Sequence, residues 1–216
     1  MIIFMDGSLL IFFQAVLSLF AIVDPLGGLP VFIALTRDLS EQERRRIFRL
    51  AVIIAFLLIV LFALVGSYVM QHVFHIALSE FAFAGGLLLV VVGIREMIVT
   101  GNPEETIPGQ SREMASRHYQ AVAVSPIACP LLAGPGTIVT VILFQGQHGH
   151  LFAISVCTVV FALTMLILSF ASRLSRLMGP IGMLAVARIM QIFIIAIGVH
   201  FMFMGLAEAF PKIFAS

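Results

Sequence analysis

Apolar runs of about 20 residues recur along nearly the whole chain and constrain its fold more than any other feature. A helix of that length crosses roughly 30 Å of hydrocarbon at about 1.5 Å per residue. Of the 216 residues, 61% are hydrophobic and only 11% are charged, which is more apolar surface than a soluble domain of this size can bury. The sequence therefore predicts an all-α integral membrane protein.

Six of these runs predict six transmembrane helices, at 8–36, 47–71, 79–100, 120–145, 151–172 and 183–209. An even number of crossings puts both termini on the same side of the membrane. Ser40 stands three residues before Glu43 and ahead of the second run, a capping-box pattern that predicts a helix start outside the lipid.

Arginines gather in the first, third and fifth connections, whereas the second and fourth connections contain neither lysine nor arginine. The arginines concerned are Arg37, Arg44, Arg45, Arg46, Arg49, Arg112, Arg117, Arg173 and Arg176. Basic residues accumulate in cytoplasmic loops, so we expect these three connections in the cytoplasm and both termini on the outer side.

The longest polar stretch, Gly101–His118, lies near the middle of the chain and predicts a cytoplasmic linker over 101–119. It separates a first half, 1–100, from a second half, 120–216, each with three predicted helices. We expect the two halves to form one membrane domain together.

A short internal repeat relates the two halves at a constant offset of 105 residues. It pairs Asp24-Pro25-Leu26 and Pro30 with Cys129-Pro130-Leu131 and Pro135, and also Gly93 with Gly198. An odd number of helices per half makes the second copy enter the membrane from the opposite side. This predicts two inverted three-helix repeats, an arrangement found in many secondary transporters.

Proline and glycine interrupt the first and fourth predicted helices, at 24–30 and 130–137. Each proline removes a backbone donor and each glycine adds backbone freedom, so neither segment can be a regular helix. Unpaired backbone groups in lipid cost several kcal/mol each, so such breaks occur only inside protein or beside a water-filled cavity. Two breaks at corresponding positions predict one shared cavity.

The helical pieces after the breaks, which we expect to begin at Pro30 and Pro135, would present free amides suited to a carboxylate. The pieces before the breaks end in free carbonyls, which can accept from an ammonium group or coordinate a monovalent cation. Together they suit a zwitterion such as an amino acid. The predicted substrate-binding residues are Asp24, Pro25, Gly27, Gly28, Pro30, Gly134, Pro135, Gly136 and Thr137.

Several polar residues in the apolar segments have a structural alternative beside a functional role. Asp24 either recognises a cation, ammonium group or proton, or caps the helix that follows. Thr137 either donates to a substrate carboxylate or bonds a carbonyl of its own helix. Gln14 and Gln191 either line the cavity or form hydrogen bonds between helices.

Charged residues near predicted helix ends have a simpler interpretation, because Arg95, Glu96 and Arg188 have side chains long enough to reach the membrane interface. The histidines are scattered, and no catalytic constellation, phosphate-binding loop or metal-ligand spacing occurs. We therefore expect no enzyme, no metal, no cofactor and no nucleic-acid partner.

Three stretches of sequence resemble the MarC family of bacterial and archaeal inner-membrane proteins: Ala21–Pro30, Pro130–Gly136 and Ala187–Met190. The resemblance extends over nearly the whole chain, including the Gly85-Gly86 pair, although Asp24 stands where the family commonly has Asn. It implies a multi-pass protein of the bacterial plasma (inner) membrane, with both termini periplasmic if the arginine pattern holds. It also implies transport, because the family includes small neutral amino acid transporters of the SnatA type.

Residues and resemblance together predict a secondary transporter of a small neutral amino acid, of the glycine, alanine and serine class, coupled to a proton or sodium gradient. The alternatives are an exporter of toxic compounds or metabolites, and an ion channel or non-transporting membrane subunit. The expected partners are the solute, the coupling ion and the lipid bilayer, and the sequence leaves open a homo-oligomer.

Overall fold

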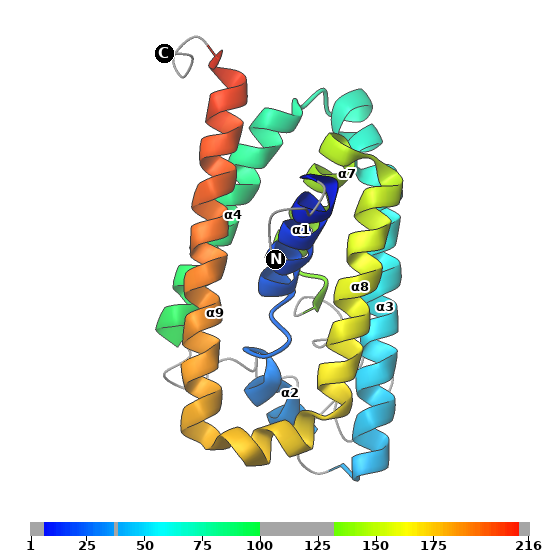
Figure 1. The fold of residues 1–216 in the computed structure, drawn as a ribbon, viewed down its shortest axis with the longest axis vertical. Coiled ribbons are helices and arrows are strands. Elements are labelled where there is room, and N and C mark those ends of the chain that lie inside the picture. The colour runs from blue at the N-terminus through cyan, green and yellow to red at the C-terminus, as the bar shows by residue number, and fades with distance from the viewer. Residues whose placement is uncertain (1–6, 37–38, 100–131, 212–216) are drawn as a thin grey trace.

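The computed structural model describes residues 7–36, 39–99 and 132–211 as helices and short connections, with no strand among them (Figure 1). The helices are α1 (Gly7–Val23), α2 (Leu29–Leu35), α3 (Glu41–Tyr68), the π-helical turn η1 (Val69–Val73), α4 (Leu78–Val99), α7 (Pro135–His148), α8 (His150–Ser169) and α9 (Ala171–Ala209). The predicted all-α class is confirmed. The predicted linker at 101–119 lies outside the described residues, as do Arg37, Arg112, Arg117, Cys129, Pro130 and Leu131.

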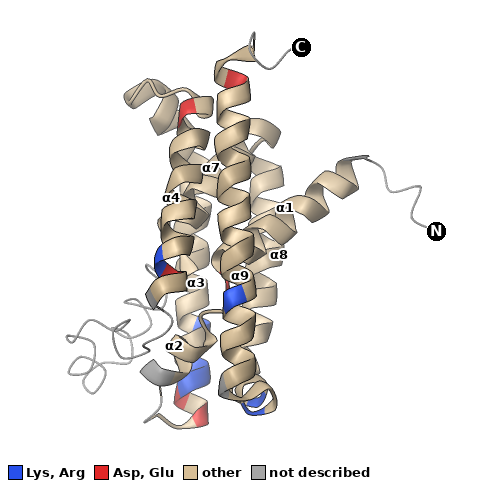
Figure 2. Cartoon of the chain, turned by 90° about the vertical axis from the view of Figure 1, so that its left-hand side faces the viewer, with Lys and Arg blue, Asp and Glu red and all other residues tan. Residues whose placement is uncertain are grey.

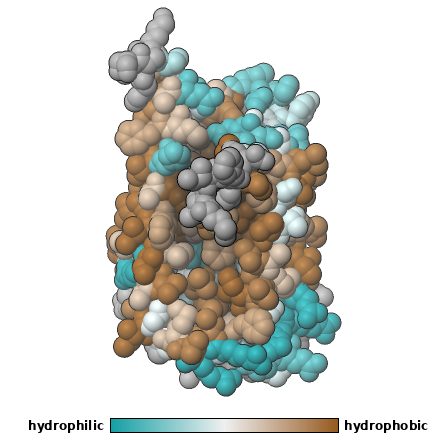
Figure 3. All heavy atoms as spheres, viewed as in Figure 1, coloured by the Kyte–Doolittle hydropathy of each residue, from teal (hydrophilic) through white to brown (hydrophobic). Residues whose placement is uncertain are grey.

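Four described helices are long and apolar enough to cross a membrane: Glu41–Val73, Leu78–Ile98, His150–Ser169 and Ile181–Ala209. A shorter apolar helix spans Ser8–Val23. On the face seen in Figure 3, apolar side chains form a broad band between more polar ends. Lipid is the solvent that such a surface requires.

The predicted interruptions and the predicted cap both occur. α1 ends at Val23 and α2 begins at Leu29, so Pro30 is the second residue of its helix rather than the first. α7 begins at Pro135 as predicted. At the start of α3, the Ser40 hydroxyl accepts from the Glu43 amide at 3.3 Å, and the Glu43 carboxylate accepts from the Ser40 amide at 2.9 Å.

The fifth connection differs from the prediction, because residues 173–182 were expected between helices and instead continue α9. α9 contains one non-helical residue, Gly179, with φ 64° and ψ 176°. Glycine adopts this left-handed φ without a steric penalty, and Pro180 after it provides no amide donor. The kink separates a short first part of α9, residues 171–178, which we call the corner helix. It runs across the base of the molecule between α8 and the long part of α9 (Figure 1).

α4 and α9 lie side by side with their backbones in contact (Figures 1 and 2). A Cβ atom on Gly198 would lie 2.7 Å from the Gly86 carbonyl oxygen, and one on Gly86 would overlap the Gly198 carbonyl oxygen. Gly205 approaches the Ser79 carbonyl oxygen in the same way. Small residues permit such close helix contacts where lipid provides no hydrophobic driving force.

α7 occupies the interior of the bundle, whereas α1 leaves it. α7 packs against α1, α3, α4 and α8, and every residue from Val139 to Gln145 is buried. α7 approaches α3 closely at Gly66, because a Cβ atom on Gly66 would lie 2.5 Å from the Ile142 side chain of α7. The N-terminal part of α1 extends away from the other helices (Figure 2).

Candidate functional site

The first helix break is a tight turn built around Asp24. Its backbone has φ 44°, a left-handed conformation that aspartate tolerates better than most residues. The Asp24 Oδ1 atom accepts from the Gly27 amide at 2.8 Å, and the Asp24 carbonyl accepts from the Gly28 amide at 3.1 Å. The carboxylate therefore caps the turn at 25–28 that leads into α2, which begins at Leu29, while a role in binding stays a prediction.

The turn requires glycine at position 27. A Cβ atom there would overlap the Asp24 carboxylate, so any side chain at Gly27 displaces the group that holds the turn. Gly28 also has little space for a side chain, because a Cβ atom there would lie 2.9 Å from the Phe32 ring. Both glycines keep the backbone of the break compact.

The second helix break leads into α7. Gly134 is the N-cap, with extended φ −68° and ψ 166°, and its carbonyl accepts from the Ile138 amide at 3.1 Å. The buried Thr137 hydroxyl donates to the Leu132 carbonyl at 3.2 Å. Leu132 lies within the predicted fourth helix, 120–145, so the bond agrees with the structural alternative for Thr137, and it crosses the break before α7. Thr137 thus stabilises the break itself.

The structure brings the two breaks together in the middle of the molecule. A Cβ on Gly136 would lie 3.3 Å from the Ile22 side chain of α1 and 2.5 Å from Leu89 of α4. Val23, at the end of α1, and Leu132 belong to the same buried core cluster. The chain leaving α1 passes beside the chain entering α7 (Figure 1).

The predicted site residues divide by burial. Those buried in the core are Pro25, Gly136 and Thr137, and those that retain accessible surface are Asp24, Gly27, Gly28, Pro30, Gly134 and Pro135. Two hollows described on the molecule lie elsewhere, one beside α3 around Leu61 and Val65, the other beside α8. Neither includes a predicted site residue, so the solute cavity expected between the breaks is not one of these two hollows.

A charged residue of α4 lies near the first break, which the sequence did not indicate. The Glu96 carboxylate lies within electrostatic range of Asp24. Arg188 of α9 is half-buried and donates to the Met97 carbonyl at the end of α4. Met97 lies near the end of α4, so that Arg188 reaches the membrane interface stays a prediction. Charged residues of α4 and α9 lie at similar heights, above the charged residues at the base of the molecule (Figure 2).

A spacing in the sequence could have indicated Glu96. Gly93 packs against α9, where its Cβ would lie 3.5 Å from the Gln191 carbonyl oxygen. Glu96 follows Gly93 by three residues and so lies on the same face of α4. Gln191 is buried, as either interpretation of that amide requires, whereas Gln14 is exposed on α1 and does not face the interior.

A polar cluster at the base ties α2 to its neighbours. The Arg44 guanidinium of α3 donates to the Thr36 carbonyl, after the end of α2, at 3.0 Å and to the Ser172 hydroxyl at 2.9 Å. Ser172 in turn donates to the Glu41 carboxylate at 3.0 Å. The second half of the broken first helix is thereby fixed to α3 and to the corner helix.

Membrane-length apolar helices around two converging helix breaks define a multi-pass α-helical membrane protein. The sequence matches the model of the MarC family of integral membrane proteins over residues 9–210. This chain belongs to that family, as the resemblance indicated.

Relatives occur in archaea and bacteria. A UPF0056 membrane protein of Archaeoglobus fulgidus is 35% identical, over 94% of this chain and 95% of the relative. YvbG of Bacillus subtilis is 28% identical, over 90% and 93%, and YhcE of Escherichia coli is 27% identical, over 93% and 94%. These names describe membrane proteins and specify no substrate. Comparison with solved structures finds no match.

Proposed function

We propose that this protein is a secondary transporter of a small neutral amino acid, of the glycine, alanine and serine class, driven by a proton or sodium gradient. The observation that carries the proposal is the convergence of two helix breaks inside a membrane-spanning bundle. Non-helical backbone within the hydrocarbon region of a membrane is tolerated only where it is buried in protein or lines a water-filled cavity. Partial exposure of Asp24, Gly27, Gly28 and Gly134 leaves backbone atoms of both breaks accessible to a solute.

The charges near the breaks suit the two ends of a zwitterion. α7 begins at the second break with Pro135 at its first position, so its free amides and positive dipole end favour a carboxylate. Asp24 and Glu96 provide negative charge for an ammonium group or a coupling cation. A solute lying between the breaks would contact both kinds of group.

The helix contacts support six crossings arranged as two inverted repeats, 1–100 and 120–216. A two-fold relation requires that if one pair of positions is in contact, the equivalent pair is too. Gly86 contacts Gly198, and Gly93 contacts Gln191. Gly86 and Gln191 are 105 residues apart, as are Gly93 and Gly198, so the two contacts are equivalent under the offset found in the sequence.

Whole helices follow the same rule. α3 packs on its counterpart α8, and α4 packs on its counterpart α9. α2 packs on α9 as its counterpart α7 packs on α4. In such an arrangement, rocking of one repeat against the other exposes the central site to each side in turn. The Arg44 cluster would hold the cytoplasmic end closed in the conformation described here.

Uptake by purified protein in liposomes tests this function. We expect labelled glycine, alanine or serine to accumulate above the level of protein-free liposomes when an inward proton or sodium gradient is imposed. Collapsing that gradient with an ionophore should abolish accumulation. If none of the three amino acids accumulates under either gradient, while the protein remains monodisperse, the proposed substrate class and coupling are wrong.

We place the protein in the plasma (inner) membrane with both termini on the outer side, because arginines gather at one end. In a variant without native cysteines, Gln147→Cys, exposed in the last helical turn of α7, should react with a membrane-impermeant maleimide in intact cells. Gln42→Cys, exposed at the start of α3, should react only after the cells are opened. The reverse labelling pattern would invert the orientation.

A further inference from the structure

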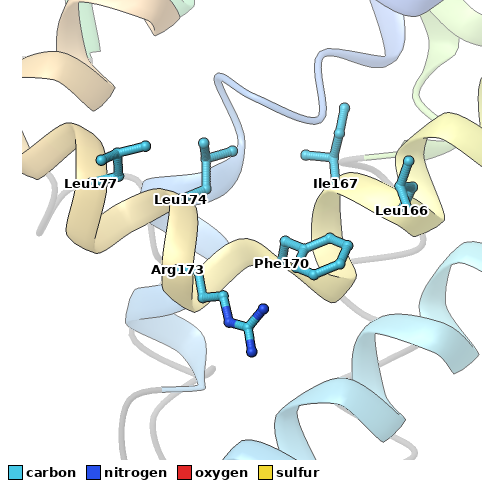
Figure 4. A pocket seen from close by; sticks show the side chains of 6 residues that line it. All are labelled: Leu166, Ile167, Phe170, Arg173, Leu174 and Leu177. Carbon is cyan, nitrogen blue, oxygen red and sulfur yellow. The ribbon is translucent and has the colours of Figure 1, made fainter.

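A shallow apolar hollow of about 370 Å³ lies where α8 meets the corner helix, residues 171–178 (Figure 4). It is lined by Leu166, Ile167, Phe170, Arg173, Leu174 and Leu177. Five of these six side chains are purely hydrocarbon. Ile167, Leu174 and Leu177 extend from one side of the chain, and the Arg173 guanidinium extends from the other (Figure 4).

Arg173 is a cation without an acidic partner in the part of the chain that the structure describes. Its guanidinium carbon lies 5.7 Å from the centroid of the Phe170 ring. Arg176 lies one turn further along the corner helix. Its guanidinium is 4.0 Å from the Glu41 carboxylate, and it does not line the hollow.

The corner helix occupies the level at which a membrane protein meets lipid headgroups. It crosses the base of the bundle where the membrane-spanning helix α8 ends (Figure 1). Leu177 is 85% exposed and Ile181, just beyond the kink, is 84% exposed. Exposed leucine and isoleucine beside exposed arginine are typical of a helix lying in the membrane interface.

We propose that this hollow binds one anionic phospholipid of the leaflet at the base, with its phosphate on Arg173 and an acyl chain against Phe170 and Leu166. Charge complementarity favours this occupant, because an unpaired arginine borders a surface that is otherwise hydrocarbon. A free phosphate ion would find no second donor there among the lining side chains. A zwitterionic lipid such as phosphatidylcholine is less favourable, because its own ammonium group compensates its phosphate.

The absence of tryptophan from the chain allows a direct test with the full-length protein. Leu166→Trp places the only indole at the rim of the hollow, at a position that is 56% exposed. Its fluorescence is measured in vesicles containing brominated phosphatidylglycerol or brominated phosphatidylcholine, whose bromines quench it on contact. We expect about fivefold tighter binding of the anionic lipid, the factor that corresponds to about 1 kcal/mol for one basic residue at a membrane surface.

Two matched variants separate this site from general attraction to a basic surface. In the Leu166→Trp background, Arg173→Gln should reduce the preference to about onefold, whereas Arg176→Gln should preserve it. Ile53→Trp, on the lipid-exposed side of α3, should show no preference. Equal preference at both tryptophan positions, or equal loss in both arginine variants, would overturn the proposal. So would displacement of the anionic lipid by millimolar glycerol 1-phosphate, which would assign the site to a free phosphate.

Discussion

Gly86→Ala is expected to lower the melting temperature of the detergent-solubilised protein by at least about 5 °C. The new Cβ would overlap the Gly198 carbonyl oxygen and lie 2.7 Å from the Met202 amide nitrogen. Both are backbone atoms, so only separation of α4 from α9 relieves the overlap, and the close packing of the two helices is lost. Overpacking of this kind costs roughly 1–3 kcal/mol.

Gly182→Ala is the matched control, because it makes the same substitution in α9 away from that contact. A Cβ on Gly182 would meet only the Met178 Cβ, at 3.3 Å. Replacing a helical glycine by alanine stabilises a helix by up to about 1 kcal/mol, so this variant should melt at or above the wild-type temperature. Equal destabilisation of both variants would mean that the α4–α9 backbone contact is not the cause.

Asp24→Asn is expected to reduce amino acid uptake at least tenfold while leaving the fold intact. The asparagine Oδ1 atom can still accept from the Gly27 amide, and asparagine tolerates the positive φ at this position. Only the negative charge is lost. A hydrogen bond to a charged group contributes roughly 1.5–3 kcal/mol, which corresponds to a factor of about ten or more in binding.

Asp24→Ala separates the two roles of the same side chain. It removes charge and cap together, so it should lower uptake and also destabilise the protein by about 1 kcal/mol. If Asp24→Asn transports like the wild type and only Asp24→Ala is impaired, the carboxylate is a helix cap and takes no part in recognition. The measurements are initial uptake rates in liposomes and melting temperatures in detergent.

Local sequence patterns predicted the features that lipid imposes most strictly. A membrane tolerates few alternatives to helices, so apolar runs located α3, α4, α8 and α9 directly. Proline and glycine located both breaks, because they alter the backbone wherever the rest of the chain lies. Ser40 and Glu43 located the start of α3 for the same reason, since a capping box involves four consecutive residues.

Contacts between distant residues could not be predicted in this way. Arg188 binds a carbonyl 91 residues earlier, and no local pattern indicates that contact. The corner helix escaped prediction because it is short and the Gly179-Pro180 pair after it is typical of a loop. The approach of Glu96 to Asp24 depends on how α4 packs, which hydrophobicity alone leaves undetermined in a membrane.

A structure with the transported amino acid bound tests the shared site most directly. We expect solute density between the two breaks, with the solute carboxylate toward the start of α7 at Gly134 and Pro135. Its ammonium group should lie toward Asp24 and the carbonyls of the first break. Density bound elsewhere, or breaks that stay packed against each other with the solute in another cavity, would show that the breaks serve helix packing and that the proposed site is wrong.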